Sequence, residues 1–264
     1  MTVHLQQDAD GVATVTIANA AKLNTLNRRV MTALLQAVDG IARDPALRVL
    51  VLRGEGARAF IGGADITEMA TLDAAGAREF ITLVHRTCDV FRRLPVPVIA
   101  RIQGYTLGAG LEVAAACDIR VAADDAVFGM PEVRIGLPSV VEAALLPGLI
   151  GWGRTRQLLL TGENIDAQRA QAWGLVEERV PADALDATVD RLVRAILANG
   201  PRAVRLQKGL ITDWETLTLD VAIQRGIDSF AAAYETDEPR RMMAGFLEQQ
   251  RRRKLPGGNR GKPT

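Results

Sequence analysis

Two glutamates, each beside a residue that fixes the backbone, are the side chains of this sequence best suited to chemistry. Glu112 follows Gly108 and Gly110, and Glu132 follows Pro131, twenty residues further along the chain. If both carboxyl groups face one water molecule, they cannot easily both be ionised, and their pKa values separate so that one is an acid and the other a base. The sequence therefore suggests a pair of carboxyl groups that moves protons.

Glycine-rich turns after two strand-like segments could supply donors for an anion. The string GYTLGAGLE, 104–112, leads from a buried strand pattern into a helical one, and the string AFIGGADITEM, 59–69, also follows a strand. A helix that begins at such a turn leaves its first N–H groups without partners, and its dipole favours negative charge there. Two N–H groups aimed at one oxygen would stabilise the enolate of a thioester.

Each of these strings also has a purely structural interpretation. Glu112 could merely favour a helix dipole, the glycine pair at 62–63 could be a plain turn, and Glu132 taken alone could be a surface glutamate. The functional prediction therefore depends on all three features occurring together.

Composition and missing motifs argue against several other classes of protein. The 264 residues carry a net charge of +1, so nucleic acid and an anionic membrane are not expected as partners. His4 and His85 lack a neighbouring acid and nucleophile, and Cys88 and Cys117 do not form a zinc ligand set. The sequence also lacks a G-x-S-x-G elbow and a phosphate-binding loop. We expect no metal site, and we expect His85 to be a residue on a helix face.

The compartment is predicted from the same features. The two cysteines do not form a disulfide framework, the first residues do not resemble a secretory signal, and no apolar run approaches the ~18–20 residues of a membrane span. These patterns predict a soluble cytoplasmic protein.

The elements that would position the strings alternate between strand and helix over the first 150 residues. Segments 3–7 and 11–17 predict a hairpin, 48–53 predicts a buried strand, and 28–43 predicts an amphipathic helix. A second round of this order follows, with a helix at about 73–94 and a strand at 98–103. Such units favour an α/β fold with parallel strands.

The last third of the chain has a different pattern. One strand is predicted at 175–180, and the final dozen residues are expected to be irregular because of their Pro and Gly content. The predicted helices are 151–160, 166–172, 182–198, 201–212, 216–233 and 237–253.

Three strings, AFIGGADITEM, IQGYTLGAGLEVAAACD and FGMPEVRIGLP, resemble in order and spacing the enoyl-CoA hydratase/isomerase (crotonase) family. The resemblance extends over about residues 12–250. It implies an α/β crotonase-type spiral of ββα repeats at 1–195 and a helical region at 196–264 that drives assembly into a trimer or a dimer of trimers. It also implies an acyl-CoA substrate and no cofactor, because coenzyme A enters as part of the thioester.

Roles for individual residues follow from the same resemblance. The backbone N–H groups of Ala64 and Ala109 would form an oxyanion hole. Glu112 would act as base towards water, and Glu132 would deliver a proton to the α-carbon. The residues matched to the substrate- and CoA-binding region are Lys22, Leu23, Gly62, Gly63, Asp65, Ile66, Gly108 and Pro131.

The chain departs from the family pattern at two places. After Pro138, where many relatives have a glycine-rich turn, the chain has Ser139-Val-Val-Glu142, which leaves the acyl preference open. We expect Glu142 on a helix surface or in a subunit contact, with a polar role near the pocket as the alternative. At the C-terminus, Lys254 or Leu255 would replace an aromatic residue that often contacts the adenine.

The predicted activity is hydration of a 2-enoyl-CoA thioester. A Δ3-Δ2 isomerase, a hydrolase or a decarboxylase acting at the same site is the alternative within the family. A CoA-ester- or RNA-binding protein with little turnover is the alternative from another functional class.

Overall fold

The computed structural model describes residues 2–254, which belong to two compact units, Met1–Leu197 and Ala198–Thr264. The described strands lie in the first unit, and the second consists of α8 (Pro201–Trp214), α9 (Leu219–Ala233) and α10 (Glu238–Lys254). No helix within residues 2–254 has the length and apolar character needed to cross a membrane. The predicted irregular ending lies outside the described residues.

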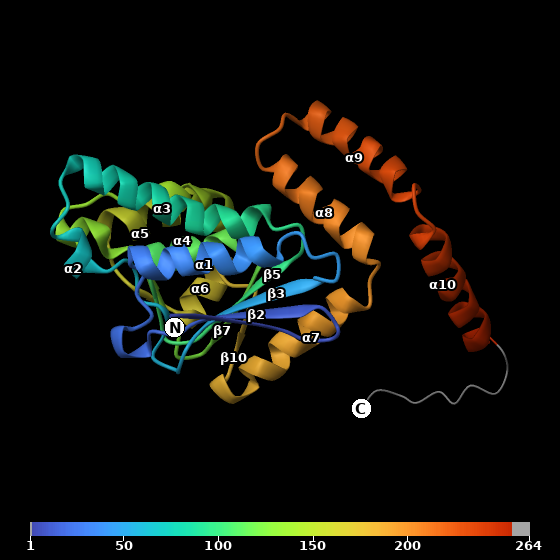
Figure 1. Ribbon diagram of the computed structural model, residues 1–264, viewed down its shortest axis with the longest axis horizontal. Helices are drawn as coiled ribbons and strands as arrows, with labels where there is room; N and C mark the ends of the chain where they lie inside the picture. Colours follow the sequence, from blue (N-terminus) through green and yellow to red (C-terminus); the bar gives the residue numbers. More distant parts are fainter. Residues whose placement is uncertain (1, 255–264) are drawn as a thin grey trace. The chain divides into compact units, whose positions relative to one another are not determined.

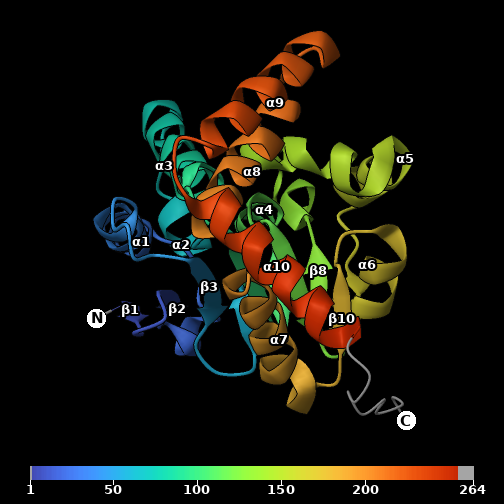
Figure 2. The same ribbon diagram turned by 90° about the vertical axis from the view of Figure 1, so that its right-hand side faces the viewer.

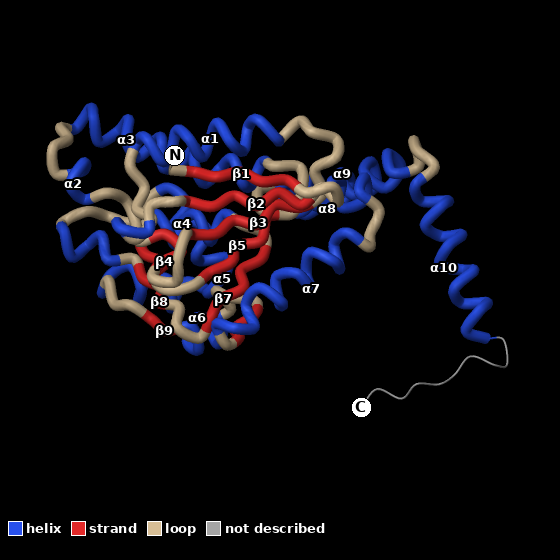
Figure 3. Tube along the Cα trace, turned by 60° about the horizontal axis from the view of Figure 1, so that its bottom comes forward, coloured by secondary structure: helices blue, strands red, loops and turns tan. Residues whose placement is uncertain are grey.

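The larger sheet of the first unit has the strand order β1-β2-β3-β5-β7-β10 (Figure 3). The first two strands pair antiparallel as the predicted hairpin, and every later neighbour in the sheet is parallel. The strands are β1 (Val3–Gln7), β2 (Val12–Ile17), β3 (Val49–Gly54), β5 (Val98–Ile102), β7 (Ile119–Ala123) and β10 (Glu178–Val180).

Helices cover both faces of this sheet (Figure 1). On one face, α1 (Arg28–Ile41) and α3 (Ala74–Arg93) pack together and contribute to the larger apolar core, with α4 (Ala109–Ala116) buried beside them. On the other face, α7 (Leu185–Leu197) packs against β3, β5 and β7. The central strands are nearly continuous apolar runs because both of their faces are covered.

A second, smaller sheet has the order β4-β6-β8-β9. Its strands are β4 (Ala59–Ile61), β6 (Tyr105–Leu107), β8 (Val127–Gly129) and β9 (Ile165–Asp166). Along the chain, β3 is followed by β4, β5 by β6, and β7 by β8, and a helical segment comes after each pair. The chain therefore repeats a ββα unit, which confirms the predicted fold class.

The other helical segments complete the first unit. The short α2 (Ile66–Met69) precedes α3, and α5 (Leu146–Thr161) packs against α6 (Ala167–Trp173) (Figure 2). The 3-10 helices are η1 (Ala20–Lys22), η2 (Pro131–Ile135), η3 (Val141–Leu145) and η4 (Ala182–Ala184). In the second unit, α8 and α9 pack against each other.

Candidate active site

A cavity of about 510 Å³ in the first unit brings four of the predicted site residues together. Ala64, Ala109, Glu112 and Glu132 all line it. The rest of its wall is mainly apolar, and α3 contributes much of it through Ala77, Phe80, Ile81 and Val84. A concave apolar site with a few convergent polar groups is the usual form of a small-molecule binding site.

Two peptide N–H groups at this cavity are available to a ligand. Leu26 donates its N–H to the carbonyl of Gly63 at 2.8 Å and accepts from the N–H of Asp65 at 2.9 Å, so the intervening N–H of Ala64 is turned the other way. Ala109 is the first residue of α4, where N–H groups lack intrahelical partners. Within residues 2–254, neither of these two N–H groups has a hydrogen-bond partner.

Gly108 makes this helix start possible. Its φ of +51° and ψ of −123° form a conformation that side chains rarely adopt. A Cβ atom at this position would also overlap Oε1 of Glu132. Glycine at 108 therefore lets the Glu132 carboxyl group lie directly against the turn that presents the Ala109 N–H.

Glu112 lies in the first turn of α4 and is only 4% exposed. Its pKa is raised from 4.5 to about 8, mainly by burial and next by the charge of Glu132. The nearby backbone N–H groups of Ala143 and Val140 act in the opposite direction and lower this pKa. At neutral pH, this raised pKa favours the protonated form of the Glu112 carboxyl group.

Glu132 lies in the first turn of η2, directly after Pro131, which occupies the first helical position. Oγ of Ser139 donates a hydrogen bond to its Oε2 at 2.8 Å. The two oxygens of this carboxyl group thus have different neighbours, Ser139 on one side and the Gly108 turn on the other. The sequence pattern relates Ser139 only to the shape of the acyl pocket and does not predict its hydrogen bond with Glu132.

Most of the residues matched to the substrate- and CoA-binding region lie in two adjoining segments, 22–23 and 62–66, whereas Gly108 and Pro131 lie at the starts of α4 and η2. The N–H of Gly62 donates to the carbonyl of Leu23 at 2.8 Å, and Lys22 pairs with Asp65 at 3.8 Å. Asp65 also caps α2 by accepting from the N–H of Thr67 at 3.0 Å. Gly63 lies in the same segment, and Ile66 is the first residue of α2. The side chain of Lys254 and residue Leu255 lie outside what the structure describes.

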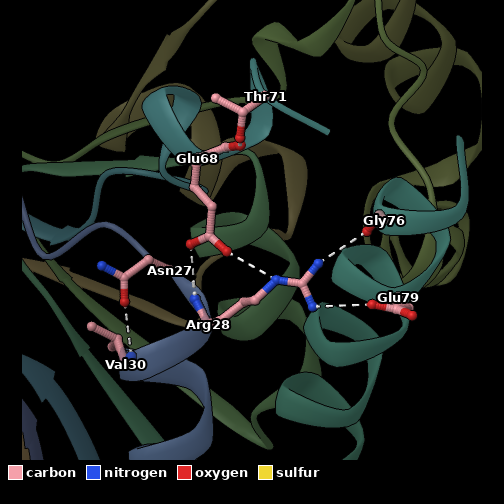
Figure 4. Close-up of polar contacts among 7 residues, drawn as sticks. All are labelled: Asn27, Arg28, Val30, Glu68, Thr71, Gly76 and Glu79. Carbon is pink, nitrogen blue, oxygen red and sulfur yellow. Dashed lines mark hydrogen bonds and ion pairs between the residues drawn. The ribbon is translucent and has the colours of Figure 1, made fainter. Parts of the chain in front are cut away.

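Arg28, the first residue of α1, forms polar contacts with α2 and α3 (Figure 4). Its guanidinium group pairs with Glu68 of α2 at 3.0 Å, donates to the carbonyl of Gly76 at 3.1 Å, and pairs with Glu79 of α3 at 3.6 Å. The same group lies 5.9 Å from the centre of the Phe80 ring, which lines the cavity. The contacts of Arg28 could not be predicted from the sequence, because its partners are 40 or more positions away.

Glu142 is buried, so the predicted helix-surface position was wrong. The residue is 4% exposed, and its Oε1 lies 2.8 Å from Nδ1 of His85 on α3. The predicted position of His85 on a helix face is correct, with 46% of its side chain exposed. Cys88 and Cys117 are buried and form no disulfide with each other. Within residues 2–254, no group of three or more His, Cys, Asp and Glu side chains could hold a metal ion.

Two available peptide N–H groups beside two carboxyl groups are typical of enzymes that stabilise an enolate and move protons next to it. Comparison with known proteins agrees with this class. The family model described as enoyl-CoA hydratase/isomerase matches residues 7–254. The chain therefore belongs to the enoyl-CoA hydratase/isomerase family.

Individual relatives cover nearly the whole chain. A crotonyl-CoA hydratase from Syntrophomonas wolfei is 35% identical, over 91% of this chain and 93% of its own length. A short-chain-enoyl-CoA hydratase from Clostridium acetobutylicum is also 35% identical, over 91% of this chain and 92% of its own. The crystal structure of an enoyl-CoA hydratase from Bacillus anthracis superposes with a TM-score of 0.90 at 30% identity, covering 94% of this chain and 97% of that one.

Proposed function

We propose that the protein is an enoyl-CoA hydratase that adds water to the double bond of a 2-enoyl-CoA thioester. The convergence of two available N–H groups, from Ala64 and Ala109, and two carboxyl groups, from Glu112 and Glu132, on one cavity carries this proposal. The hydratase names of the relatives support the substrate class. The reaction needs no cofactor, since coenzyme A is part of the substrate and the chain's own carboxyl groups can transfer the protons.

The order of groups along the cavity suggests how the acyl group is placed. A thioester oxygen bound between the N–H groups of Ala64 and Ala109 would put the α-carbon next to the Gly108 turn, where the Glu132 carboxyl group lies. The β-carbon is one bond further from the carbonyl group, and we place it beside Glu112. This placement keeps the roles expected from the family resemblance, with Glu132 acting on the α-carbon and Glu112 acting on water.

The active form of the pair carries one proton. We assign the proton of the free enzyme to Glu112, because burial disfavours the charged form of that residue. A water molecule between the two carboxyl groups can accept the proton from Glu112 while it gives another to Glu132, which leaves the total charge unchanged. The form that reacts then has a charged Glu112 and a protonated Glu132.

Hydration follows from this form. Glu112 removes a proton from water as the water oxygen bonds to the β-carbon, and the electron pair of the double bond moves onto the thioester oxygen. The N–H groups of Ala64 and Ala109 stabilise that oxygen, an effect of about 3–4 kcal/mol for one donor in comparable sites. Glu132 then donates its proton to the α-carbon. The pair ends with its proton on Glu112, which is its resting arrangement.

Direct assay tests the proposal. Purified protein should remove the conjugated enoyl absorbance of crotonyl-CoA, and both Glu112→Gln and Glu132→Gln should lower kcat by about 100-fold or more, since general acid–base catalysis contributes ~10²–10⁴-fold. Unchanged absorbance with short, medium and branched 2-enoyl thioesters would contradict hydration. A 3-enoyl thioester serves as the test for isomerase activity.

Isotope exchange separates the two roles. In D2O, a saturated acyl-CoA bound in the oxyanion hole should exchange its α-protons in the wild type and in Glu112→Gln, whereas Glu132→Gln should abolish the exchange. Exchange that survives in Glu132→Gln but not in Glu112→Gln would reverse the assignment while leaving the hydratase activity itself in place.

A further inference from the structure

The hydration mechanism leaves one buried acid without a role. Glu142 lies in η3, is 4% exposed, and meets His85 of α3 at 2.8 Å. Burying a carboxylate is costly unless it is paired and hydrogen-bonded. The thiol of Cys88, also on α3, lies near the same carboxyl group, and after burial itself the charge of Glu142 raises the pKa of this thiol. The side chain of Glu142 is thus anchored to α3 rather than to solvent.

The backbone beside Glu142 is strained. Val141 has a φ of +39°, in a region where a β-branched side chain is a clear outlier. Such a conformation is unfavourable and persists only when the surroundings hold it in place. The contact of Glu142 with α3 lies directly on the C-terminal side of this strained residue and is therefore suited to hold it.

The strained turn also contacts Glu112. The 3-10 helix η3 packs against α4, and Val140 and Glu112 line the same cavity. The backbone N–H groups of Val140 and Ala143 are close enough to the Glu112 carboxyl group to lower its pKa against the effect of burial. The segment 140–143 therefore lies between two helices, with Glu112 of α4 on one side and His85 of α3 on the other.

We infer that the His85–Glu142 pair is a positioning element that fixes the 140–143 turn and so aims the Glu112 carboxyl group at the substrate water. His85 and Glu142 do not touch substrate and act only through the turn. This inference rests on the proposed hydratase function. It extends that function by assigning a role to two residues. One of them, Glu142, lies in the segment after Pro138, where this chain lacks the glycine-rich turn of many relatives.

The charges around Glu112 give an additional readout. Glu132 from η2 and Glu142 from η3 both raise the pKa of Glu112, after burial itself, and the buried thiols Cys88 and Cys117 lie nearby. Replacement of Glu142 by Gln removes one of these negative charges. It should therefore shift the alkaline limb of the kcat/KM profile to lower pH, which a purely structural residue would not do.

The test compares His85→Ala with His85→Asn, whose amide nitrogen can replace Nδ1, and with His4→Ala, an exposed histidine on β1 as the matched control. His85→Ala should lower kcat by about 10- to 100-fold, as expected for a misaligned catalytic group, and leave KM within about twofold. His85→Asn should recover most of kcat, and His4→Ala should resemble the wild type. For the acid, Glu142→Gln is paired with the exposed Glu163→Gln as its control.

Hydrogen–deuterium exchange provides a measurement that does not depend on turnover. The amides of segment 140–145 should exchange faster in His85→Ala than in the wild type and in His4→Ala. Unchanged exchange together with kcat within twofold of the wild type would overturn the inference, as would an equal loss of kcat in His85→Ala and His85→Asn. Failure of the hydratase proposal would show itself separately, as a wild-type protein with no activity on any enoyl thioester.

Discussion

At the scale of single residues, the site depends on two carboxyl groups with contrasting surroundings. Glu112 is buried inside α4, whereas Glu132 is partly exposed and hydrogen-bonded to Ser139. Environments that differ in this way separate an acid from a base within one pair. The pair of glutamates could be predicted from the sequence. The contacts of Ser139 and His85 could not be predicted. The His85–Glu142 contact, for example, spans 57 positions and depends on how α3 packs against η3.

The pH dependence follows from the raised pKa of Glu112. Because this pKa is about 8, the pair keeps its single proton through neutral pH and loses it as the pH rises through about 8. We expect kcat/KM for crotonyl-CoA to be level near pH 7 and to fall about tenfold per pH unit well above 8. A fall that begins near pH 5 would contradict the protonated resting state of Glu112.

Ser139 is expected to orient Glu132. Ser139→Ala removes the donor at 2.8 Å and should lower kcat/KM by about 10-fold, since hydrogen bonds to charged groups contribute ~1.5–3 kcal/mol. The measurement is a steady-state hydration assay, with Ser229→Ala in α9 as the matched control. Equal activity of the two variants would show that the hydroxyl group has no part in positioning Glu132.

At the scale of elements, the start of α4 determines where the Ala109 N–H points. The Gly108 start of this helix could be predicted from the glycines that follow a strand pattern. The smaller sheet could not, because its strands are only two or three residues long and too short for a periodic pattern. That sheet is nevertheless what holds the glycine turns, since β6 ends at Leu107, just before the helix begins.

Gly110 tests the packing of this helix. A Cβ atom at 110 would overlap the backbone carbonyl of Ile61 in β4, which cannot rotate away. Gly110→Ala should therefore push α4 from β4, lower the free energy of unfolding by about 1–3 kcal/mol, and reduce hydration. Chemical denaturation and the enoyl assay measure the two effects. Gly148→Ala in α5, where a Cβ atom meets open space, is the control and should be close to neutral.

At the scale of the whole molecule, the second unit presents apolar side chains that its own helices leave uncovered. Leu219, Ile223, Ile227 and Phe230 recur along α9 and are 75%, 55%, 58% and 69% exposed in the single chain. Large exposed apolar patches mark interaction surfaces. The predicted trimer or dimer of trimers would require such a surface, and the helical character of this region was clear from its sequence periodicity.

The assembly can be tested through α9. If α9 forms the predicted assembly surface, Ile227→Glu combined with Phe230→Glu should yield smaller species than the unsubstituted protein, because charged groups cannot be buried unpaired in an apolar contact. Light scattering coupled to size exclusion measures the mass, and Gln224→Glu, an exposed polar position on the same helix, is the control. An unchanged mass in the double variant would remove α9 from the assembly surface.

The apolar wall of the cavity and its two carboxyl groups belong to different elements. This separation affects how the range of substrates can change. Ala77, Ile81 and Val84, all on α3, form apolar wall, whereas the reacting carboxyl groups belong to α4 and η2. Exchanging small for bulky side chains along one stripe of α3 would alter the length of acyl chain admitted without touching those groups. In the proposed function, the acyl preference can therefore be changed by substitutions in one helix that leave the two carboxyl groups in place.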